Sequence, residues 1–145
     1  METLTQNQFQ APMDLVISNP PYRRATSGRI NPNSQRAIAR HEIKTTLSGV
    51  VAVAGRMLRT AGRFIMIYSA ERLTDLLVQL RSVRIEPKFI RFIHSRQETE
   101  AKLILLEGMK AGNPGMKVGA PLVMYNEDGA YSENMNAMFQ VTGWY

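Results

Sequence analysis

Apolar residues follow two different spacings in the first half of the chain. Met13–Ser18 is a short apolar run with β-branched residues that ends at two prolines, which predicts a buried strand of a parallel sheet. From Ile43 to Leu58 the apolar residues recur at helical spacing, and Gly62 is placed to end that helix as a C′ glycine. Arg63–Tyr68 then predicts the next strand.

The following segment combines one more helix with two strands. Ser69 can cap the helix. Its apolar stripe consists of four leucines, Leu73, Leu76, Leu77 and Leu80. Lys88–His94 and Ala101–Glu107 are strand-like, and the short segment Ser95–Glu100 joins them. Because so short a connection cannot cross over a sheet, we expect these two strands to pair antiparallel.

The C-terminal region contains more turns than regular elements. Lys110–Pro121 is rich in glycine and proline and predicts a loop. Leu122–Tyr125 and Ala130–Tyr131 flank Asp128-Gly129, which predicts a hairpin, and the last ten or so residues show no clear period. The order strand–helix–strand–helix–strand–strand indicates an α/β architecture with a mostly parallel sheet.

Composition narrows the possible chemistry. The 145 residues fit one domain, and 44% hydrophobic with 21% charged residues is typical of a globular protein. Cysteine is absent, which excludes disulfides, thiolate metal sites and a catalytic thiol. With two histidines, His41 and His94, a histidine-based metal centre is not expected. We expect a cytoplasmic protein without a membrane segment, since no apolar run approaches the roughly 20 residues of a spanning helix and Met1–Gln10 lacks a signal-peptide core.

Positive charge is concentrated in one stretch of the chain. The formal net charge is +6. Residues 22–63 contain nine Lys and Arg residues against the single acid Glu42, whereas residues 118–145 contain three acids and no Lys or Arg. Such clustering is expected of a protein that binds a polyanion, although a solvated basic face would have the same composition.

The most informative motif follows the first predicted strand. Asn19-Pro20-Pro21-Tyr22 stands where an open α/β sheet places its ligands, at the carboxyl end of a strand. Prolines stiffen this turn and bring carbonyl oxygens without a competing N–H. The motif is therefore suited to accept hydrogen bonds from an amino group beside an aromatic ring.

These residues resemble the S-adenosylmethionine-dependent methyltransferases that modify exocyclic amino groups, with their [ND]PP[YFW] signature. The similarity extends from about Pro12 to Ser132 and is strongest to the bacterial tRNA adenine-N6 branch. The segments that carry it are Asn19-Pro20-Pro21-Tyr22, Ala39-Arg40-His41-Glu42, the Gly62 junction, Ala70-Glu71-Arg72-Leu73, Glu86-Pro87-Lys88, Glu107-Gly108-Met109-Lys110, Pro121-Leu122-Val123-Met124-Tyr125 and Gly129-Ala130-Tyr131-Ser132.

The resemblance implies roles for the motif residues. The Asn19 amide oxygen and the Pro20 carbonyl would accept hydrogen bonds from the adenine amino group, which favours a pyramidal nitrogen and directs its lone pair at the sulfonium methyl. Tyr22 would stack on the extruded base, with Pro21 beside it. Apart from the resemblance, the arginines that follow the motif could form a flexible arm that grips RNA phosphates beside the target base, or could serve only to keep the loop soluble. That arm consists of Arg23, Arg24, Arg29, Arg36 and Arg40.

The chain departs from the family pattern before its first strand. Members have three further strand–helix units there, with a glycine-rich turn and an acidic residue that bind the cofactor, whereas the thirteen residues Met1–Met13 contain no glycine. We therefore expect the C-terminal part of a Rossmann-like class I methyltransferase sheet, equivalent to its fourth to seventh strands with the last one antiparallel, and only a partial cofactor site at Asn19. Residues 1–12 would be a disordered segment or linker, 13–107 a partial α/β core, and 108–145 a loop, hairpin and tail.

Three hypotheses remain open at this point. The chain could be the substrate side of an adenine-N6 methyltransferase whose N-terminal half is a separate chain or has been lost, which we favour, and the isolated chain would then be inactive. It could instead be a non-catalytic remnant that binds nucleic acid through the basic stretch; the resemblance favours tRNA, whereas charge alone does not distinguish RNA from DNA. Finally, it could be an interaction module that pairs with itself or a partner through the bare strand Asp14–Ser18.

Overall fold

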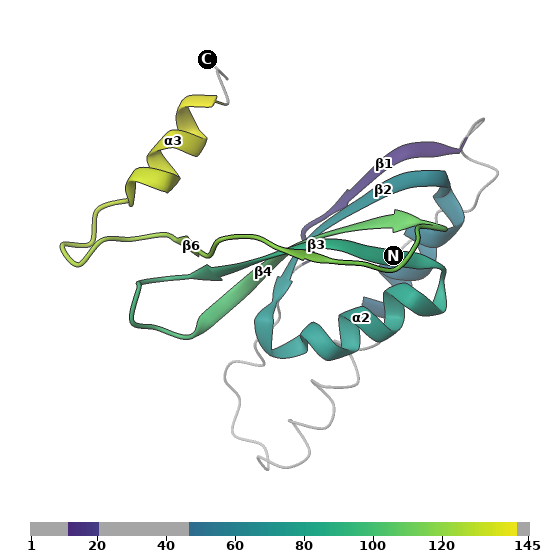
Figure 1. The fold of residues 1–145 in the computed structure, drawn as a ribbon, viewed down its shortest axis with the longest axis horizontal. Helices are drawn as coiled ribbons and strands as arrows, with labels where there is room; N and C mark the ends of the chain where they lie inside the picture. Colours follow the sequence, from purple (N-terminus) through teal and green to yellow (C-terminus); the bar gives the residue numbers. More distant parts are fainter. Residues whose placement is uncertain (1–11, 21–46, 142–145) are drawn as a thin grey trace, which may run out of the picture.

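The computed structural model describes residues 12–20 and 47–141 and shows a curled mixed sheet with helices packed against it (Figure 1). The elements in chain order are β1 (Met13–Ser18), a helix over residues 47–57, β2 (Leu58–Ser69), the 3₁₀ turn η2 (Ala70–Arg72), α2 (Leu73–Ser82), β3 (Ile85–His94), β4 (Ala101–Lys110), β5 (Lys117–Val118), β6 (Leu122–Val123) and α3 (Glu133–Val141). The expected α/β class is confirmed.

Three of the long strands end at the same edge of the sheet. The strand order is β1-β2-β4-β3-β5, and β6 also pairs with β3. β1 pairs parallel with β2, whereas β4 is antiparallel to both β2 and β3. The carboxyl ends of β1, β2 and β3 therefore meet at one edge, which we call the carboxyl edge. The antiparallel hairpin expected from the short turn between β3 and β4 is confirmed, and β4 inserts between β2 and β3.

The core lies on one face of this sheet. Alternate side chains of β2, β3 and β4 point to that face, as the two-residue period of a strand requires. The helix over residues 47–57 contributes three residues to the same core, and α2 contributes two leucines of its predicted stripe. The buried core residues are Leu47, Val51, Ala54, Leu58, Phe64, Met66, Tyr68, Leu76, Leu80, Ile85, Ile90, Ile104 and Leu106. Both helices therefore pack against the strands that lead to the carboxyl edge.

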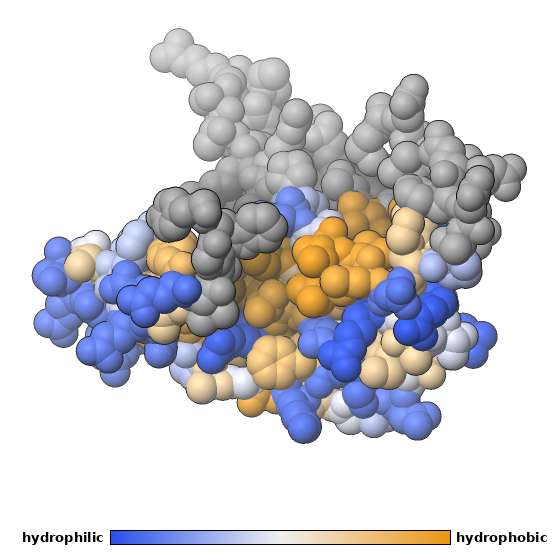
Figure 2. Space-filling view, turned by 90° about the horizontal axis from the view of Figure 1, so that it is seen from above, coloured by the Kyte–Doolittle hydropathy of each residue, from blue (hydrophilic) through white to orange (hydrophobic). Residues whose placement is uncertain are grey.

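β1 forms the opposite boundary of the described sheet from β5 and β6, and its side chains are more exposed than those of a buried strand. Val16 packs against the core, but 46% of Leu15 and 67% of Ile17 are exposed. The face that carries β1 is seen from above in Figure 2, where hydrophobic surface gathers near its centre. Among the described strands, β1 has a neighbour on one side only, which is β2.

The prediction that Gly62 ends the first helix is wrong. The helix ends at residue 57, and Gly62 lies inside β2. Between the pairs Met13↔Leu58 and Leu15↔Arg63, β2 has three more residues than β1, so it bulges outward. A Cβ at Gly62 would stand 2.9 Å from the Arg59 carbonyl oxygen, and glycine is therefore needed for the close approach.

Three smaller differences concern the second half of the chain. Ser69 precedes the helical segment as expected but makes no side-chain capping hydrogen bond. Lys117–Val118, within the predicted loop, pairs with β3 as β5. The aperiodic C-terminal segment contains α3, whose first turn is capped by Ser132: its hydroxyl oxygen accepts the Met135 N–H at 3.2 Å. The predicted hairpin is confirmed by the antiparallel bridge between Tyr125 and Tyr131.

Candidate functional site

The candidate site begins where β1 leaves the sheet. Ser18 is in register with Met66 of the parallel neighbour β2, so the next two residues, Asn19 and Pro20, stand at the carboxyl edge. Asn19 is exposed and Pro20 is buried. A buried proline fixes the backbone direction by its restricted φ, and the preceding asparagine is then presented at the surface. The structure thus places the first two motif residues as an open α/β sheet places ligand-binding residues.

The carboxyl edge is bordered by segments from later in the chain. β2 continues to Ser69, three residues beyond Met66, so η2 starts just past the level of Asn19 and Pro20. At the same edge β3 ends at His94, whose Nδ1 lies 2.7 Å from the Thr99 carbonyl oxygen in the β3–β4 turn. The site is therefore assembled from residues that are about 50 to 80 positions apart in sequence.

An aromatic cluster follows β6 at this edge. β6 pairs with the end of β3, and the hairpin that follows brings Tyr125 and Tyr131 into a stack with ring centroids 5.3 Å apart. Phe139 of α3 meets Tyr131 edge to face at 5.3 Å. Sequence analysis did not assign these rings to any site. The aromatic and tyrosine-rich composition around the Asp-Gly turn is the signal that could have indicated the cluster.

The other predicted site residues lie outside the described residues. They are Pro21, Tyr22, Arg23, Arg24, Arg29, Arg36 and Arg40. The stacking role of Tyr22 and the phosphate-binding role of the arginine arm therefore remain predictions. Of the predicted site residues the structure describes Asn19 and Pro20, which follow β1 at the carboxyl edge, and their roles also remain predictions.

The described cations of the basic stretch are partly neutralised by distant acids. Arg59 forms an ion pair with Asp14 of β1, and Arg63 forms one with Glu107 of β4. Both acids come from outside the basic stretch, 44 and 45 residues away in sequence. The charge of +8 counted along the sequence therefore overstates the positive potential that this part of the molecule can offer to a polyanion.

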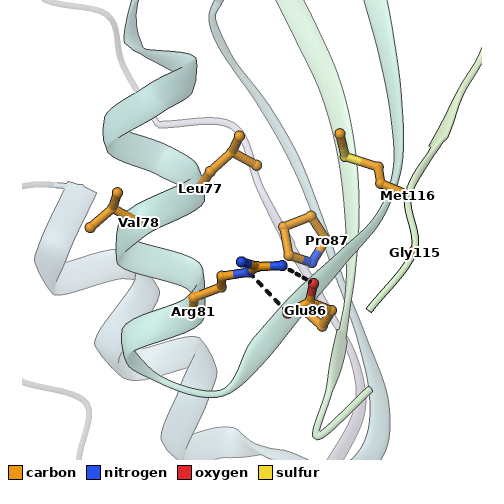
Figure 3. Close-up of a pocket in the computed structure, with 7 residues that line it drawn as sticks. All are labelled: Leu77, Val78, Arg81, Glu86, Pro87, Gly115 and Met116. Atoms are coloured by element: carbon orange, nitrogen blue, oxygen red, sulfur yellow. Dashed lines mark hydrogen bonds and ion pairs between the residues drawn. The ribbon is translucent and has the colours of Figure 1, made fainter. Parts of the chain in front are cut away.

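A separate pocket of about 320 Å³ lies far from the carboxyl edge, where α2 ends and β3 begins (Figure 3). It is lined by Leu77, Val78, Arg81, Glu86, Pro87, Gly115 and Met116. Arg81 donates two hydrogen bonds to the Glu86 carboxylate, at 3.1 and 2.6 Å, and these bonds together with the Glu86 charge raise the pKa of Arg81. Arg81 already forms an ion pair with Glu86, and most of the other lining residues are apolar. The pocket therefore has few free hydrogen-bond donors for an anionic ligand.

Two lysines in the same region hold the backbone instead of a ligand. Lys110 donates to the Val83 carbonyl oxygen at 2.6 Å, and Lys88 donates to that of Asn113 at 2.9 Å. Burial, and then the charge of Arg84, lower the pKa of Lys110. In the described part of the chain we find no group of three or more histidine or acidic residues able to hold a metal ion, and no helix there is long and apolar enough to cross a membrane.

Comparisons with known proteins agree on a methyltransferase relationship. No protein-family model matches the chain. The tRNA1(Val) (adenine(37)-N6)-methyltransferase of Porphyromonas gingivalis is 31% identical over 107 residues, which are 74% of this chain and 40% of the relative. The protein of the same name from Aeromonas salmonicida is 26% identical over 136 residues, 92% of this chain and 55% of the relative.

The fold comparison points the same way. The structure of a protein described as a predicted O-methyltransferase from Agrobacterium tumefaciens superposes with a TM-score of 0.66 at 18% identity, covering 92% of this chain and 55% of the other. The resemblance to tRNA adenine-N6 methyltransferases and the class I methyltransferase-type fold are thereby confirmed. The chain spans about half the length of these relatives or less.

The described residues fit the acceptor side of a methyl-transfer site but do not by themselves enclose S-adenosylmethionine. Asn19 is exposed at the edge, and no further strand lies outside β1 among the described residues. Leu15 and Ile17 are exposed as well, on the face of β1 opposite the one by which Val16 packs against the core.

Proposed function

We propose that this chain is the substrate-binding part of an adenine-N6 methyltransferase that acts on tRNA in the cytoplasm, with S-adenosylmethionine as the methyl donor. One observation carries the proposal: the parallel pair β1–β2 delivers Asn19 and Pro20 to the carboxyl edge of the sheet. The named relatives support the reaction and its tRNA substrate, since both are tRNA adenine-N6 methyltransferases. We also propose that residues 1–145 form a single domain.

The proposed role of the chain is to hold and orient the amino group. An adenine N6 nitrogen is a poor nucleophile because its lone pair is delocalised into the ring. The Asn19 side-chain oxygen and the Pro20 carbonyl can accept its two hydrogens, and this arrangement favours the pyramidal nitrogen that attack requires. Tyr22 would stack on the base, an interaction worth roughly 1–3 kcal/mol per base. The cofactor, when bound, supplies the methyl group on a sulfonium.

The first test compares the chain alone with the chain supplied with a cofactor-binding part. We expect the 145-residue chain alone to bind unmodified tRNA with an affinity that falls as salt rises, because phosphate contacts release counterions, and to show no micromolar binding of S-adenosylmethionine by calorimetry. Methyl incorporation into tRNA should require the separately expressed remainder of the Porphyromonas gingivalis relative. Salt-independent or absent tRNA binding would refute the substrate role, and tight cofactor binding by the chain alone would refute the incomplete site.

The open side of β1 is the proposed docking edge for a cofactor-binding half. No described strand pairs with its outer backbone, and Leu15 and Ile17 are exposed, so β1 can accept a strand of another polypeptide. The opposite boundary of the sheet is blunted by comparison, because β5 and β6 have two residues each. In the absence of that half, the same edge can pair with a second copy, and an antiparallel pair centred on Val16 would set Leu15 of one copy opposite Ile17 of the other.

Ile17→Lys tests this edge. We expect the isolated chain to form dimers or larger species at high concentration and the variant to be monomeric, because a lysine on an edge strand opposes strand pairing. Light scattering coupled to size exclusion measures the difference. Val78→Lys is the matched control, since Val78 is an exposed apolar residue on α2 (63% exposed) and should leave association unchanged. A monomeric parent chain, or equal association of all three proteins, would count against pairing through β1.

A further inference from the structure

Arg72 has the most unusual setting of the described charged side chains. It is the last residue of η2, and 16% of its side chain is exposed. Its Nε and Nη2 atoms are buried, and neither has a hydrogen-bond acceptor among the residues that the structure describes. The Asp75 carboxylate stands 2.7 Å from Nη2 and compensates the charge, but without hydrogen-bond geometry. Buried donors without an acceptor are costly and therefore indicate a missing partner.

The two orphaned nitrogens form one edge of the planar guanidinium group. That edge presents two parallel N–H donors, the arrangement that matches the two oxygens of a carboxylate or phosphate. Arg81, in the last turn of α2, shows the same guanidinium edge with both donors hydrogen-bonded: its Nε and Nη2 both donate to Glu86 (Figure 3). The difference is that the Asp75 carboxylate near Arg72 accepts no hydrogen bond from Nε or Nη2, and no other described residue does.

The position of Arg72 in the fold links its guanidinium group to the candidate site. β2 runs parallel to β1 and ends at Ser69, and the chain then turns into η2 just beyond the level of Asn19 and Pro20. Arg72 therefore stands at the carboxyl edge, in the turn that follows the strand next to the one that carries the motif. Arg81 and Arg84 lie at the opposite edge, where α2 ends and β3 begins.

We infer that Arg72 binds a backbone phosphate of the nucleic-acid strand beside the target base, an inference that rests on the proposed function. A phosphodiester offers two non-bridging oxygens to the Nε–Nη2 edge and satisfies both orphaned donors at once. Arg72 lies just below the surface, and Asp75, with 38% of its side chain exposed, can turn into solvent as the phosphate enters. The contact would fix the register of the strand while Asn19 and Pro20 hold the base.

The test compares two arginines in the full 145-residue chain. Binding of a fluorescent single-stranded RNA is measured over a range of salt concentrations for the parent, Arg72→Gln and Arg84→Gln. Arg84 is exposed at the opposite edge, so its replacement removes the same charge elsewhere. We expect Arg72→Gln to weaken binding at least about tenfold and to lower the slope of log affinity against log salt by about 0.7, the value for one phosphate on a single strand. Arg84→Gln should do neither.

Two further variants separate binding from a structural role. Arg72→Lys keeps the charge but lacks the two-donor edge, so it should retain the salt slope and still bind more weakly than the parent. Arg72→Met removes the orphaned donors, and its thermal midpoint without RNA should be unchanged or higher. A clearly lower midpoint would identify a structural cation and overturn the inference.

The outcomes distinguish this inference from the function on which it rests. Equal RNA binding by Arg72→Gln and Arg84→Gln, with salt-dependent binding by the parent, would overturn the role of Arg72 and leave the proposed function standing. A parent chain that binds no nucleic acid would refute the proposed function, and the inference with it.

Discussion

Replacing Asn19 by alanine is expected to lower methyl transfer by about a hundredfold or more, the loss that follows removal of one preorganised hydrogen-bonding group from a reaction centre. The side-chain oxygen of Asn19 is proposed to accept a hydrogen of the adenine amino group, and alanine has no acceptor to replace it. Asn19 is also exposed, so its truncation leaves the core intact. The measurement is methyl incorporation into unmodified tRNA by the chain supplied with a cofactor-binding part.

Two controls make this result specific. Asn134→Ala removes the same side chain from the exposed surface of α3 and should keep full activity. Asn19→Asp keeps an acceptor oxygen at the site and should retain measurable transfer. RNA binding by Asn19→Ala should match that of the parent, because the residue contacts the amino group and no phosphate. Parent-level transfer by Asn19→Ala would contradict the proposed clamp on the amino group.

Replacing Phe64 by alanine is expected to lower the free energy of unfolding by about 3–5 kcal/mol, the usual cost of emptying a phenylalanine site in a packed core. Phe64 is fully buried at the centre of β2. A loss of this size is a large part of the roughly 5–15 kcal/mol that stabilises a typical domain. Phe64 is also in register with Val16 of β1, so the strand that carries Asn19 should loosen as well.

Urea unfolding followed by circular dichroism measures this change. The control is Val78→Ala on α2, where 63% of the side chain is exposed and the expected change lies within about 0.5 kcal/mol. A loss below about 1 kcal/mol for Phe64→Ala would mean that the core formed by β2 and the two helices is less tightly packed than the structure shows.

Local signals in the sequence predicted most of the elements well. The bounds of the strand Met13–Ser18 are confirmed, because β-branched residues followed by prolines specify both its conformation and its end. The leucine stripe predicted α2, and its Leu76 and Leu80 are buried. α3 was missed because a short terminal helix with an exposed surface has little apolar periodicity to detect.

The junction at Gly62 shows where local interpretation fails. A glycine after an amphipathic helix is a common C′ residue, and the sequence contains no sign that the strand begins four residues earlier. The bulge lies against β1, and a Gly62 Cβ would stand 2.9 Å from the Arg59 carbonyl oxygen and 3.1 Å from that of Met13. The need for glycine therefore comes partly from the bulge itself and partly from a residue 49 positions away.

By itself, the sequence determined the α/β class, the strand that leads into Asn19-Pro20, the antiparallel hairpin and the relationship to adenine-N6 methyltransferases. The class, the strand and the hairpin follow from side-chain period, proline geometry and the length of a connection, whereas the relationship rests on motifs that resemble that family. The tertiary structure decided the rest: the insertion of β4 between β2 and β3, the pairing of Arg59 and Arg63 with Asp14 and Glu107, and the burial of Arg72 in the turn at the carboxyl edge. These features join residues far apart in the chain, and only packing brings such residues into contact.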